Sequence, residues 1–510
     1  MPRKTLFRLF HFPVVLFAIL VLTTMSASAQ TTGGTLRGIV QDAQEGIIPD
    51  ARVTATNEST QVQLDTVTSS RGIYSFPNLL IGSYTVAVEY SGFKKFVIKN
   101  VPVSANQITR ADATLEVGDI TAYVEVVGGA ELISSTTSQI GTTIERQEVL
   151  DIPNSVPGGS PLNLAVLLPN TTTQQGGLLG EGGAIGGNRP ENNTFTVDGV
   201  ENNYLINPKS MQPVIQDAVA ELNLISNQFD AEYGHSTAGH FNIITKSGTK
   251  DYHGSAFYYS RNRNLNALDN LAKEAIEEGS IDGKPRYDYN RLGGTLGGPI
   301  LQDKLFFFTA YEYSTRGEEA NGVTVLGPTQ AGMDILEGLA ANSAVADLLQ
   351  EFPVASTASD TIVVNDQDIP IGNVLLFAPN YDNRHAFQTN IDYNAGSHQY
   401  RARFLIDRYR SLNQNPMLPQ PQFTGDRADD SLKFSLTDIW TLSPRMVNDL
   451  RLSYSRYVED YKVPEEYQGY PNIWIYNMGL NVGPNDIAPQ KNVQNNYQII
   501  NNMTYLTGRH

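Results

Sequence analysis

The sequence of 510 residues contains no cysteine, which excludes disulfide bonds, cysteine-ligated zinc and thiol catalysis. Charged residues make up only 17% of the chain and the formal net charge is −17, so the basic face that nucleic-acid binding requires is missing. No apolar run beyond residue 22 is long enough for a transmembrane helix, so any membrane span would have to be a β-barrel. The HExxH and GxSxG motifs are also absent. We therefore expect no enzyme activity, no metal and no cofactor.

Residues 1–29 have the features of a secretory signal peptide. A positive stretch at residues 3–8 precedes the apolar run Leu9–Leu22, and the small residues Ala27–Ala29 offer a cleavage site. A membrane anchor is the alternative, but the run is short and is interrupted by Pro13. Beyond this segment, 43 glycines and 25 tyrosines favour β structure with many turns.

Short strands separated by turns predict a small β-sandwich over residues 33–117. Runs of roughly five to eight residues rich in valine, threonine, isoleucine and tyrosine recur about every ten residues. The segment resembles the carboxypeptidase regulatory-like domain, a transthyretin-like sandwich with a carbohydrate-binding-like fold, at Gly38, Val40, Asp42, Pro49, Ala51, Val53, Gly72, Tyr74, Phe76, Leu79, Gly82, Tyr84, Gly92 and Phe93. No zinc-binding cluster accompanies it, so an exported peptidase, a third hypothesis that the domain name suggests, is disfavoured. We expect either a glycan- or partner-binding accessory domain or a spacer.

Residues 118–130 form a linker with a short β-prone run. Such a run can bind a partner by adding a strand through main-chain hydrogen bonds. A last sandwich strand and an inert linker are the alternatives. The run comprises Ala122, Tyr123, Val124, Glu125, Val126 and Val127.

Residues 131–251 form a glycine- and asparagine-rich unit. We expect a strand and short helix over Ile140–Leu150, a strand at Thr194–Val197, and a turn at Asp198-Gly199. The glycines of residues 176–187 open no helix and lead to no GK[ST] motif, so a phosphate-binding loop is disfavoured. His235 and His240 lack a third ligand and are weak evidence for a metal site.

From residue 252 onward the sequence alternates apolar and polar residues. In Phe387–Tyr393, Tyr400–Asp407, Leu432–Trp440 and Leu450–Ser455, apolar side chains share one face and polar ones the other. Alternation of this kind is the signature of an outer-membrane β-barrel. Six of the 25 tyrosines precede residue 252, so 19 fall in this region, as expected for aromatic girdles at the membrane interfaces. A soluble sandwich would also alternate, but explains the charged inner faces less well.

Three motifs occur along the chain in the same order as in a known protein family. Residues 188–203 read NRPENNTFTVDGVENN, residues 226–267 contain AEYG, TKSGT, HGS and RN, and residues 292–316 predict a hairpin turning at Asp303-Lys304. This pattern resembles TonB-dependent outer-membrane receptors of the Oar-like branch. The resemblance implies a mainly β chain: a small transthyretin-like β-sandwich, an α/β plug domain, and part of a transmembrane antiparallel β-barrel over residues 252–510.

The resemblance also implies function and partners. It implies active uptake of an unidentified extracellular ligand in the cell outer membrane, with the sandwich in the periplasm. The partners are TonB with its inner-membrane energising proteins, bound at residues 122–127, and outer-membrane lipid. Plug–barrel or plug-apex contacts are expected at Asn188, Arg189, Asn192, Asn193, Asp198, Glu221 and Glu232, and Arg189, Glu221 and Glu232 are expected to pair with charges of the barrel interior.

Two further expectations concern the barrel. Receptors that this chain resembles use more strands than the seven or eight expected after residue 252, so we expect that the chain is an N-terminal fragment. The long polar intervals 262–286 and 317–383 are expected to be extracellular loops. The alternative function is an outer-membrane surface binding or adhesion protein, in which the barrel only anchors the sandwich and the loops.

Overall fold

The computed structural model describes residues 32–119, 123–127, 140–152, 160–172, 181–206, 209–227, 236–268, 270–277, 283–284, 286–319, 323–376, 379–413, 421–475 and 480–505. The proposed signal peptide, Ala122, Glu232 and His235 lie outside these residues. In the described part of the chain, no helix has both the length and the apolar character that crossing a membrane would need.

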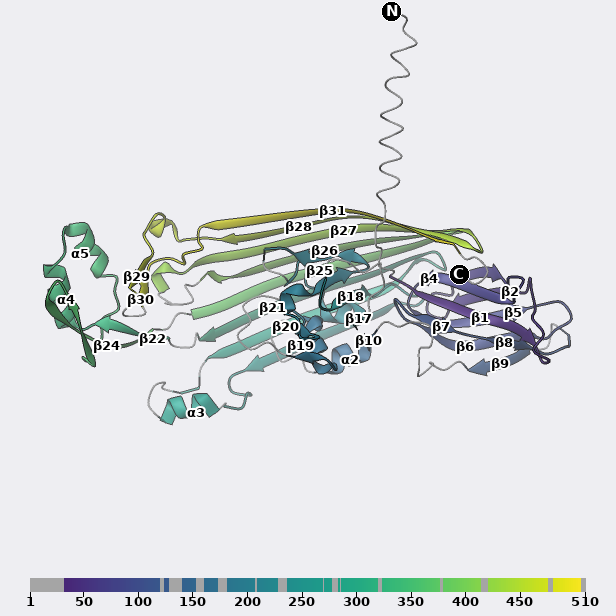
Figure 1. Ribbon diagram of the computed structural model, residues 1–510, viewed down its shortest axis with the longest axis horizontal. Helices are drawn as coiled ribbons and strands as arrows, with labels where there is room; N and C mark the ends of the chain where they lie inside the picture. Colours follow the sequence, from purple (N-terminus) through teal and green to yellow (C-terminus); the bar gives the residue numbers. More distant parts are fainter. Residues whose placement is uncertain are drawn as a thin grey trace, which may run out of the picture.

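The first unit is a two-sheet sandwich, as the sequence predicted (Figure 1). One sheet has the order β4-β1-β7, with β8 also paired to β1, and the other has the order β3-β2-β5-β6-β9. Alternate residues of β5, among them Tyr84, Val86 and Val88, are buried between the sheets. The strands are β1 (Gly34–Asp42), β2 (Arg52–Asn57), β3 (Gln63–Val67), β4 (Ile73–Leu79), β5 (Gly82–Glu89), β6 (Lys95–Val103), β7 (Ile108–Arg110), β8 (Ala113–Leu115) and β9 (Tyr123–Val127).

The middle unit is a small α/β domain around a five-stranded sheet of order β10-β17-β18-β13-β14. The strand and short helix expected over Ile140–Leu150 are present as β10 and α2, and the expected strand Thr194–Val197 is β13. The main elements are β10 (Ile140–Glu145), α2 (Arg146–Asp151), η1 (Pro161–Leu167), η2 (Pro190–Asn192), β13 (Thr194–Val197), β14 (Val200–Glu201), η3 (Gln216–Ala218), β17 (Val219–Asn227) and β18 (His240–Thr245). Two short ladders flank them: β11 (Thr171–Thr172) with β12 (Ala184–Ile185), and β15 (Asn203–Tyr204) with β16 (Lys209–Ser210).

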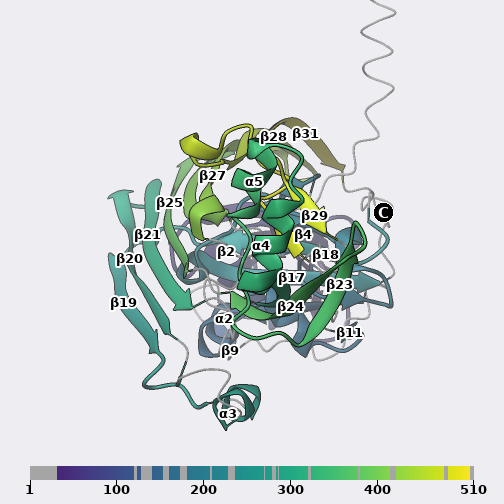
Figure 2. The same cartoon turned by 90° about the vertical axis from the view of Figure 1, so that its left-hand side faces the viewer.

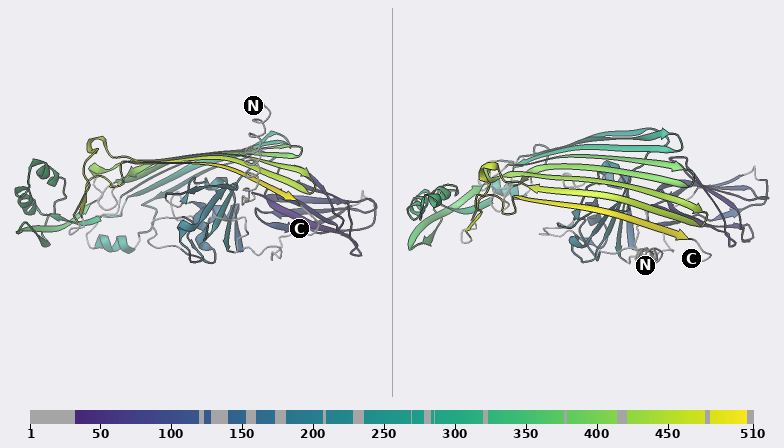
Figure 3. Two further views of the ribbon diagram at one scale, coloured as in Figure 1. Left: turned by 45° about the horizontal axis from the view of Figure 1, so that its top comes forward. Right: turned by 90° about the horizontal axis from the view of Figure 1, so that it is seen from above.

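The third unit is one antiparallel sheet of eight long strands, in the order β19-β20-β21-β25-β26-β27-β28-β31. The sheet curves around the middle unit, which lies against its concave face (Figure 2). The strands lie side by side along their length (Figure 3). They are β19 (His253–Asn262), β20 (Tyr287–Leu301), β21 (Leu305–Glu319), β25 (Pro379–Ala395), β26 (His398–Asn413), β27 (Gly425–Ser443), β28 (Met446–Tyr461) and β31 (Gln490–Tyr505).

The two faces of this sheet differ as the alternation predicts. The convex face exposes large apolar side chains, including Phe387, Ile391, Phe434, Leu436 and Leu452. The concave face buries polar and charged side chains against the middle unit, including Gln388, Asn390, Arg403, Lys433 and Arg451. Alternate side chains of a strand point to opposite faces, so one sequence can meet apolar surroundings on one side and a polar partner on the other.

The two ends of the sheet also differ. At one end the connections are short, such as the turn at Asp303-Lys304 between β20 and β21, and the sandwich lies there (Figure 1). At the other end the connections are long. One carries α3 (Asn270–Glu277), and another β22 (Val323–Pro328), α4 (Gln330–Gly338), α5 (Ser343–Leu349), β23 (Asp360–Val364) and β24 (Gln367–Leu376).

The long connections contain more structure than the sequence predicted. The interval 317–383 holds a three-stranded sheet, β22-β24-β23, with two helices. Its buried cluster takes Phe423 and Val482 from two other connections. These connections also carry η4 (Pro421–Phe423), η5 (Glu465–Tyr467), β29 (Ile473–Ile475) and β30 (Leu480–Val482). The core joins residues far apart in sequence, which explains why local patterns did not reveal it. We call these packed elements the loop module.

Candidate functional site: the contact between the middle unit and the curved sheet

A tight turn of the middle unit lies against the concave face of the curved sheet. We call Val197–Glu201 the latch turn. Its ends pair as Val197 with Val200, and its two central residues, Asp198 and Gly199, have φ of 49° and 68°. A two-residue hairpin of this kind needs positive φ at both central positions, which the sequence Asp-Gly provides. The turn predicted from the sequence is therefore confirmed.

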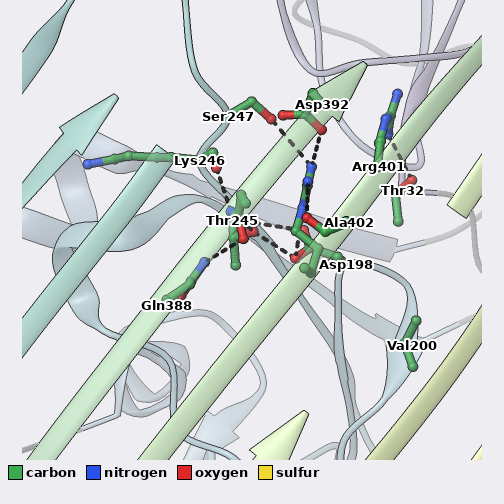
Figure 4. Close-up of polar contacts among 12 residues, drawn as sticks. Thr32, Asp198, Val200, Thr245, Lys246, Ser247, Gln388, Asp392, Arg401 and Ala402 are labelled. Carbon is green, nitrogen blue, oxygen red and sulfur yellow. Dashed lines mark hydrogen bonds and ion pairs between the residues drawn. The ribbon is translucent and has the colours of Figure 1, made fainter. Parts of the chain in front are cut away.

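The Asp198 carboxylate joins the middle unit to the sheet. Its Oδ1 accepts a hydrogen bond from the Thr245 backbone N–H (3.0 Å), and its Oδ2 accepts one from the Thr245 hydroxyl (2.7 Å). Arg403 Nε of β26 lies 3.7 Å from Oδ2, and Arg403 Nη2 donates to Asp392 of β25 at 2.8 Å. The side chains around Thr245 converge here (Figure 4). Asp198 therefore accepts hydrogen bonds from Thr245 at the end of β18, and it also faces the guanidinium of Arg403 on the curved sheet, which we call the wall.

The next three residues of the latch turn bind the sheet through their backbone. Arg451 Nη1 donates to the Gly199 carbonyl at 3.1 Å. Lys433 Nζ donates to the carbonyls of Val200 at 3.2 Å and Glu201 at 2.9 Å. Strands β27 and β28 thus each direct one cation at the turn.

These cations are almost fully removed from solvent. Lys433 and Arg451 are each only 1% exposed. A buried charge is tolerated only when it is paired or hydrogen-bonded, since desolvation costs several kcal/mol per ion. Arg451 also pairs with Asp449, whereas Lys433 donates to the two turn carbonyls. Pulling the turn away would leave the Lys433 ammonium without these acceptors, so the contact holds the turn firmly.

A second contact secures the segment after β18. Asn390 Nδ2 of β25 donates to Thr245 Oγ1 at 2.8 Å and to the Lys246 carbonyl at 2.6 Å. Because Thr245 also bonds Asp198, the amide and the latch turn belong to one hydrogen-bond network. The network is polar throughout, and in a low-dielectric interior its hydrogen bonds reinforce one another.

Further toward the loop module, a polar cavity of about 420 Å³ lies between the middle unit and the sheet. Arg316, Arg384 and Arg427 of the wall each face a carboxylate, with Arg384 Nε 2.5 Å from Asp407. The middle unit contributes Glu181 and Lys209. The cavity is therefore lined by both positive and negative side chains, and their charges balance.

The predicted contact residues fall into four groups. Asp198 lies in the latch turn. Asn193 is buried inside the middle unit, where its side chain donates to the carbonyls of Glu181 and Gly183. Asn188, Arg189 and Asn192 lie at the surface of the middle unit, and Arg189 makes no ion pair with any other residue that the structure describes. Glu221 contacts the sandwich.

The structure corrects the partner expected for Glu221. Its Oε1 accepts hydrogen bonds from Asn223 Nδ2 at 2.5 Å and from the Ala105 backbone N–H of the sandwich at 3.1 Å. Burial of this carboxylate, with Glu145 directly across the β10–β17 ladder, raises its pKa to about 7. A cation of the curved sheet was expected at this position, and the contacts given by the structure are an amide and a backbone N–H instead.

The candidate partner-binding run forms strand β9, which pairs in parallel with β6 from Lys95↔Tyr123 to Lys99↔Val127. It is the last strand of its sheet among the described residues. Glu125 pairs with Lys99 at 3.0 Å, and Val126 is exposed. The alternative interpretation, a last sandwich strand, therefore describes its position, and among the described residues no further strand pairs with its other edge.

The functional residues that sequence reasoning did not assign are the wall residues that meet the latch turn. The alternation had already put Arg403, Lys433 and Arg451 on the polar face. No sequence signal paired them with the turn, because most of their partners are backbone carbonyls. Among the described residues, no group of three or more metal-ligating side chains is found.

Comparison with known proteins gives matches to two families. Residues 244–510 match the family described as outer membrane beta barrel domain, and residues 35–116 match the carboxypeptidase regulatory-like domain. The chain is 31% identical over 306 residues to the TonB-dependent transporter Oar of Myxococcus xanthus. That match covers 58% of this chain but only 28% of the relative's length.

Solved structures give more distant similarities. A ferric enterobactin receptor mutant of Pseudomonas aeruginosa is 13% identical, with a TM-score of 0.40 over 64% of this chain and 42% of that one. The siderophore receptor PirA of Acinetobacter baumannii is 12% identical, with a TM-score of 0.34 over 63% of this chain and 48% of that one.

Proposed function

The chain belongs to the outer membrane beta barrel domain family, and from that premise we propose that it is a TonB-dependent transporter that takes up an extracellular solute. The eight-stranded sheet forms barrel wall in the outer membrane, and the middle unit, residues 131–251, is the plug. The whole protein's activity is a proposal, because the chain spans 28% of the length of the Oar relative.

The observation that carries the proposal is the latch turn. A barrel that served only as an anchor would need no charged groups directed at a folded domain inside it. Here Arg403, Lys433 and Arg451, from three adjacent strands, hold consecutive residues of one plug turn. The contacts of this turn are polar, which suits a plug that is held at rest and is displaced by an applied force.

The cavity supplies a place for the solute between the plug and the wall. It faces the loop module and is lined by four cationic and four anionic side chains: Lys209, Arg316, Arg384, Arg427, Glu181, Asp382, Asp407 and Asp429. A solute that contacts Glu181 or Lys209 touches the plug directly. Binding on the outside is thereby linked to the domain that has to move.

Strand β9 supplies the proposed TonB contact. Main-chain hydrogen bonds from an added strand need unpaired backbone groups along an edge, and β9 has such an edge among the described residues. Proline at Val126 would remove a backbone N–H and constrain the strand, whereas threonine there keeps both the N–H and β-branching.

The test measures binding of the purified C-terminal domain of TonB from the same organism to the detergent-solubilised protein. We expect saturable binding to the wild type and to Val126→Thr. We expect none to Val126→Pro or after deletion of residues 122–127. Binding that survives the deletion would refute the site, and no binding to the wild type would refute the partner.

A second function is favoured by the loop module. Its own buried core, with Val325, Phe352 and Ile371, makes it a folded surface rather than a set of open loops. Adhesion or ligand capture through this surface would need no energy from the inner membrane. Surface binding of the natural target that persists unchanged in cells without TonB, with no internalisation in wild-type cells, would favour this function.

A further inference from the structure

The sandwich is docked against the sheet by buried polar contacts. Asn78, at the end of β4, donates from Nδ2 to Asp449 Oδ2 of β28 at 2.8 Å. Thr32 accepts a hydrogen bond from Arg401 Nη1 of β26 at 3.3 Å. All four residues are less than a tenth exposed. A spacer on a free tether would leave these groups in water.

The sandwich also contacts the plug. The Ala105 N–H donates to Glu221 of β17, and Gln107 Nε2 donates to Thr143 Oγ1 of β10 at 2.9 Å. Ala105 has no solvent exposure. The sandwich therefore contacts both parts whose relative movement transport would require.

The docking face encloses a small cavity. A cavity of about 30 Å³ lies between the sandwich residues Leu64, Leu80 and Tyr84 and the wall residues Phe306 and Tyr400. That volume holds on the order of one water molecule. The sandwich thus lies directly on the short-turn end of the sheet (Figures 1 and 3).

A chain of contacts joins this docking face to the latch turn. Asn78 binds Asp449, Asp449 pairs with Arg451, and Arg451 binds the Gly199 carbonyl. The methyl group of Thr32 also packs at Gly199, since a Cβ built there would lie 2.7 Å from Thr32 Cγ2. The position of the sandwich therefore influences both Arg451 and the turn that it holds.

From these contacts we infer that the sandwich is a clamp on the plug. While docked, it fixes Asp449 and Arg451 in the arrangement that holds the latch turn, and it has to undock before the plug can leave. Interfaces between domains that are polar and modest in size separate reversibly. The accessory domain thus acts on the plug of its own chain.

The origin of the force that would undock the sandwich rests on the proposed function, in which TonB binds β9. Strand β9 is hydrogen-bonded to β6 of the sandwich, so a pull by TonB on β9 would load the sandwich before it loads the plug. The clamp itself is independent of TonB, and it can be tested in the purified protein without any cargo.

The test is hydrogen–deuterium exchange on the detergent-solubilised protein carrying Asn78→Asp. This change keeps the size of the side chain and tolerates the positive φ of 55° at this position, but it sets two carboxylates face to face. We expect exchange in peptides covering Ala105 and the latch turn to accelerate about tenfold or more, since the buried contact is lost. Exchange in β5, inside the sandwich core, should not change.

The charge swap Asn78→Asp with Asp449→Asn is the matched control. It restores one carboxylate and one amide across the docking contact, so protection at Ala105 should return toward the wild-type level. Asp449→Asn alone shows how the loss of the Asp449 carboxylate changes the contact of Arg451 with the latch turn. Faster exchange at Ala105 with an unchanged latch turn would overturn the clamp, because docking would then not control the turn. No change at either site would overturn the docking contact itself.

A second variant covers the case in which Asn78→Asp unfolds the sandwich and exposes β5. Because the chain has no cysteine, Gln107→Cys with Thr143→Cys introduces a single thiol pair across the sandwich–plug contact. Joining the two thiols with a short bifunctional reagent should slow exchange at the latch turn relative to the same protein left unjoined. Equal rates in the two samples would overturn the clamp.

Discussion

Replacing Glu221 by glutamine is expected to stabilise the plug at alkaline pH and to leave it unchanged at acid pH. The carboxylate is buried, and it lies opposite Glu145 in the β10–β17 ladder. Its pKa rises from 4.5 to about 7 in the folded protein. Glutamine has similar size and keeps an oxygen that can accept from the Ala105 N–H.

The direction in which stability changes with pH follows from proton binding to Glu221. Between pH 4.5 and about 7 the folded state holds a proton on Glu221 that the unfolded state has released. Stability therefore falls as pH rises through this range and levels off above it. A shift of about 2.5 pH units, at about 1.4 kcal/mol per unit, corresponds to about 3 kcal/mol. Glu221→Gln should show none of this loss.

The assay is pulse proteolysis of the detergent-solubilised protein across a urea gradient at pH 5 and pH 8. The free-energy difference between Glu221→Gln and the wild type should be small at pH 5 and about 3 kcal/mol at pH 8. Glu145→Gln removes only the smaller, coulombic cause of the raised pKa, because that side chain is exposed, and it should change stability by roughly 0.2–1 kcal/mol. The same pH dependence in Glu221→Gln and wild type would show that the buried Glu221 carboxylate does not destabilise the plug.

Three other changes test the plug–wall contact. Gly199→Ala would place Cβ 2.1 Å from Arg451 Nη1 and would cost about 1–2 kcal/mol for the left-handed backbone alone, so hydrogen exchange at the turn should accelerate. Lys433→Met removes the donor to the carbonyls of Val200 and Glu201 and should lower the free energy of plug unfolding by about 1–3 kcal/mol in urea. Leu405→Ala removes a wall residue packed in the plug core and should cost about 2–5 kcal/mol. Phe404→Ala, on the opposite face of β26, should leave plug stability near wild type in the same assay.

Much of the fold could be predicted because its signals are local. The sandwich strands follow from runs of β-formers between turns, and the hairpin at Asp198-Gly199 follows from a dipeptide that accepts positive φ. The inner position of Lys433 follows from alternation along one strand. Each signal depends on only a few neighbouring residues, so it can be recognised without knowledge of the tertiary structure.

The remaining features depend on pairings that the sequence does not encode locally. Lys433 donates to backbone carbonyls, and because every residue carries one, the sequence does not show which carbonyls it binds. Leu405 breaks the polar pattern of the inner face because the plug core reaches the wall there. Glu221 was assigned to the wrong partner because the docked sandwich could not be foreseen from the sequence. The loop module likewise gathers its core from three separate connections.

The most direct test of the account is the accessibility of the latch turn in living cells. Val200 is only 1% exposed, and in a chain without cysteine Val200→Cys carries the single thiol. A maleimide that enters the periplasm should leave this thiol unlabelled in uncoupled cells or in cells without TonB, and should label it in energised wild-type cells grown in complex medium. Labelling that is equal in all three cultures would contradict a plug held by the barrel wall and released by energised TonB.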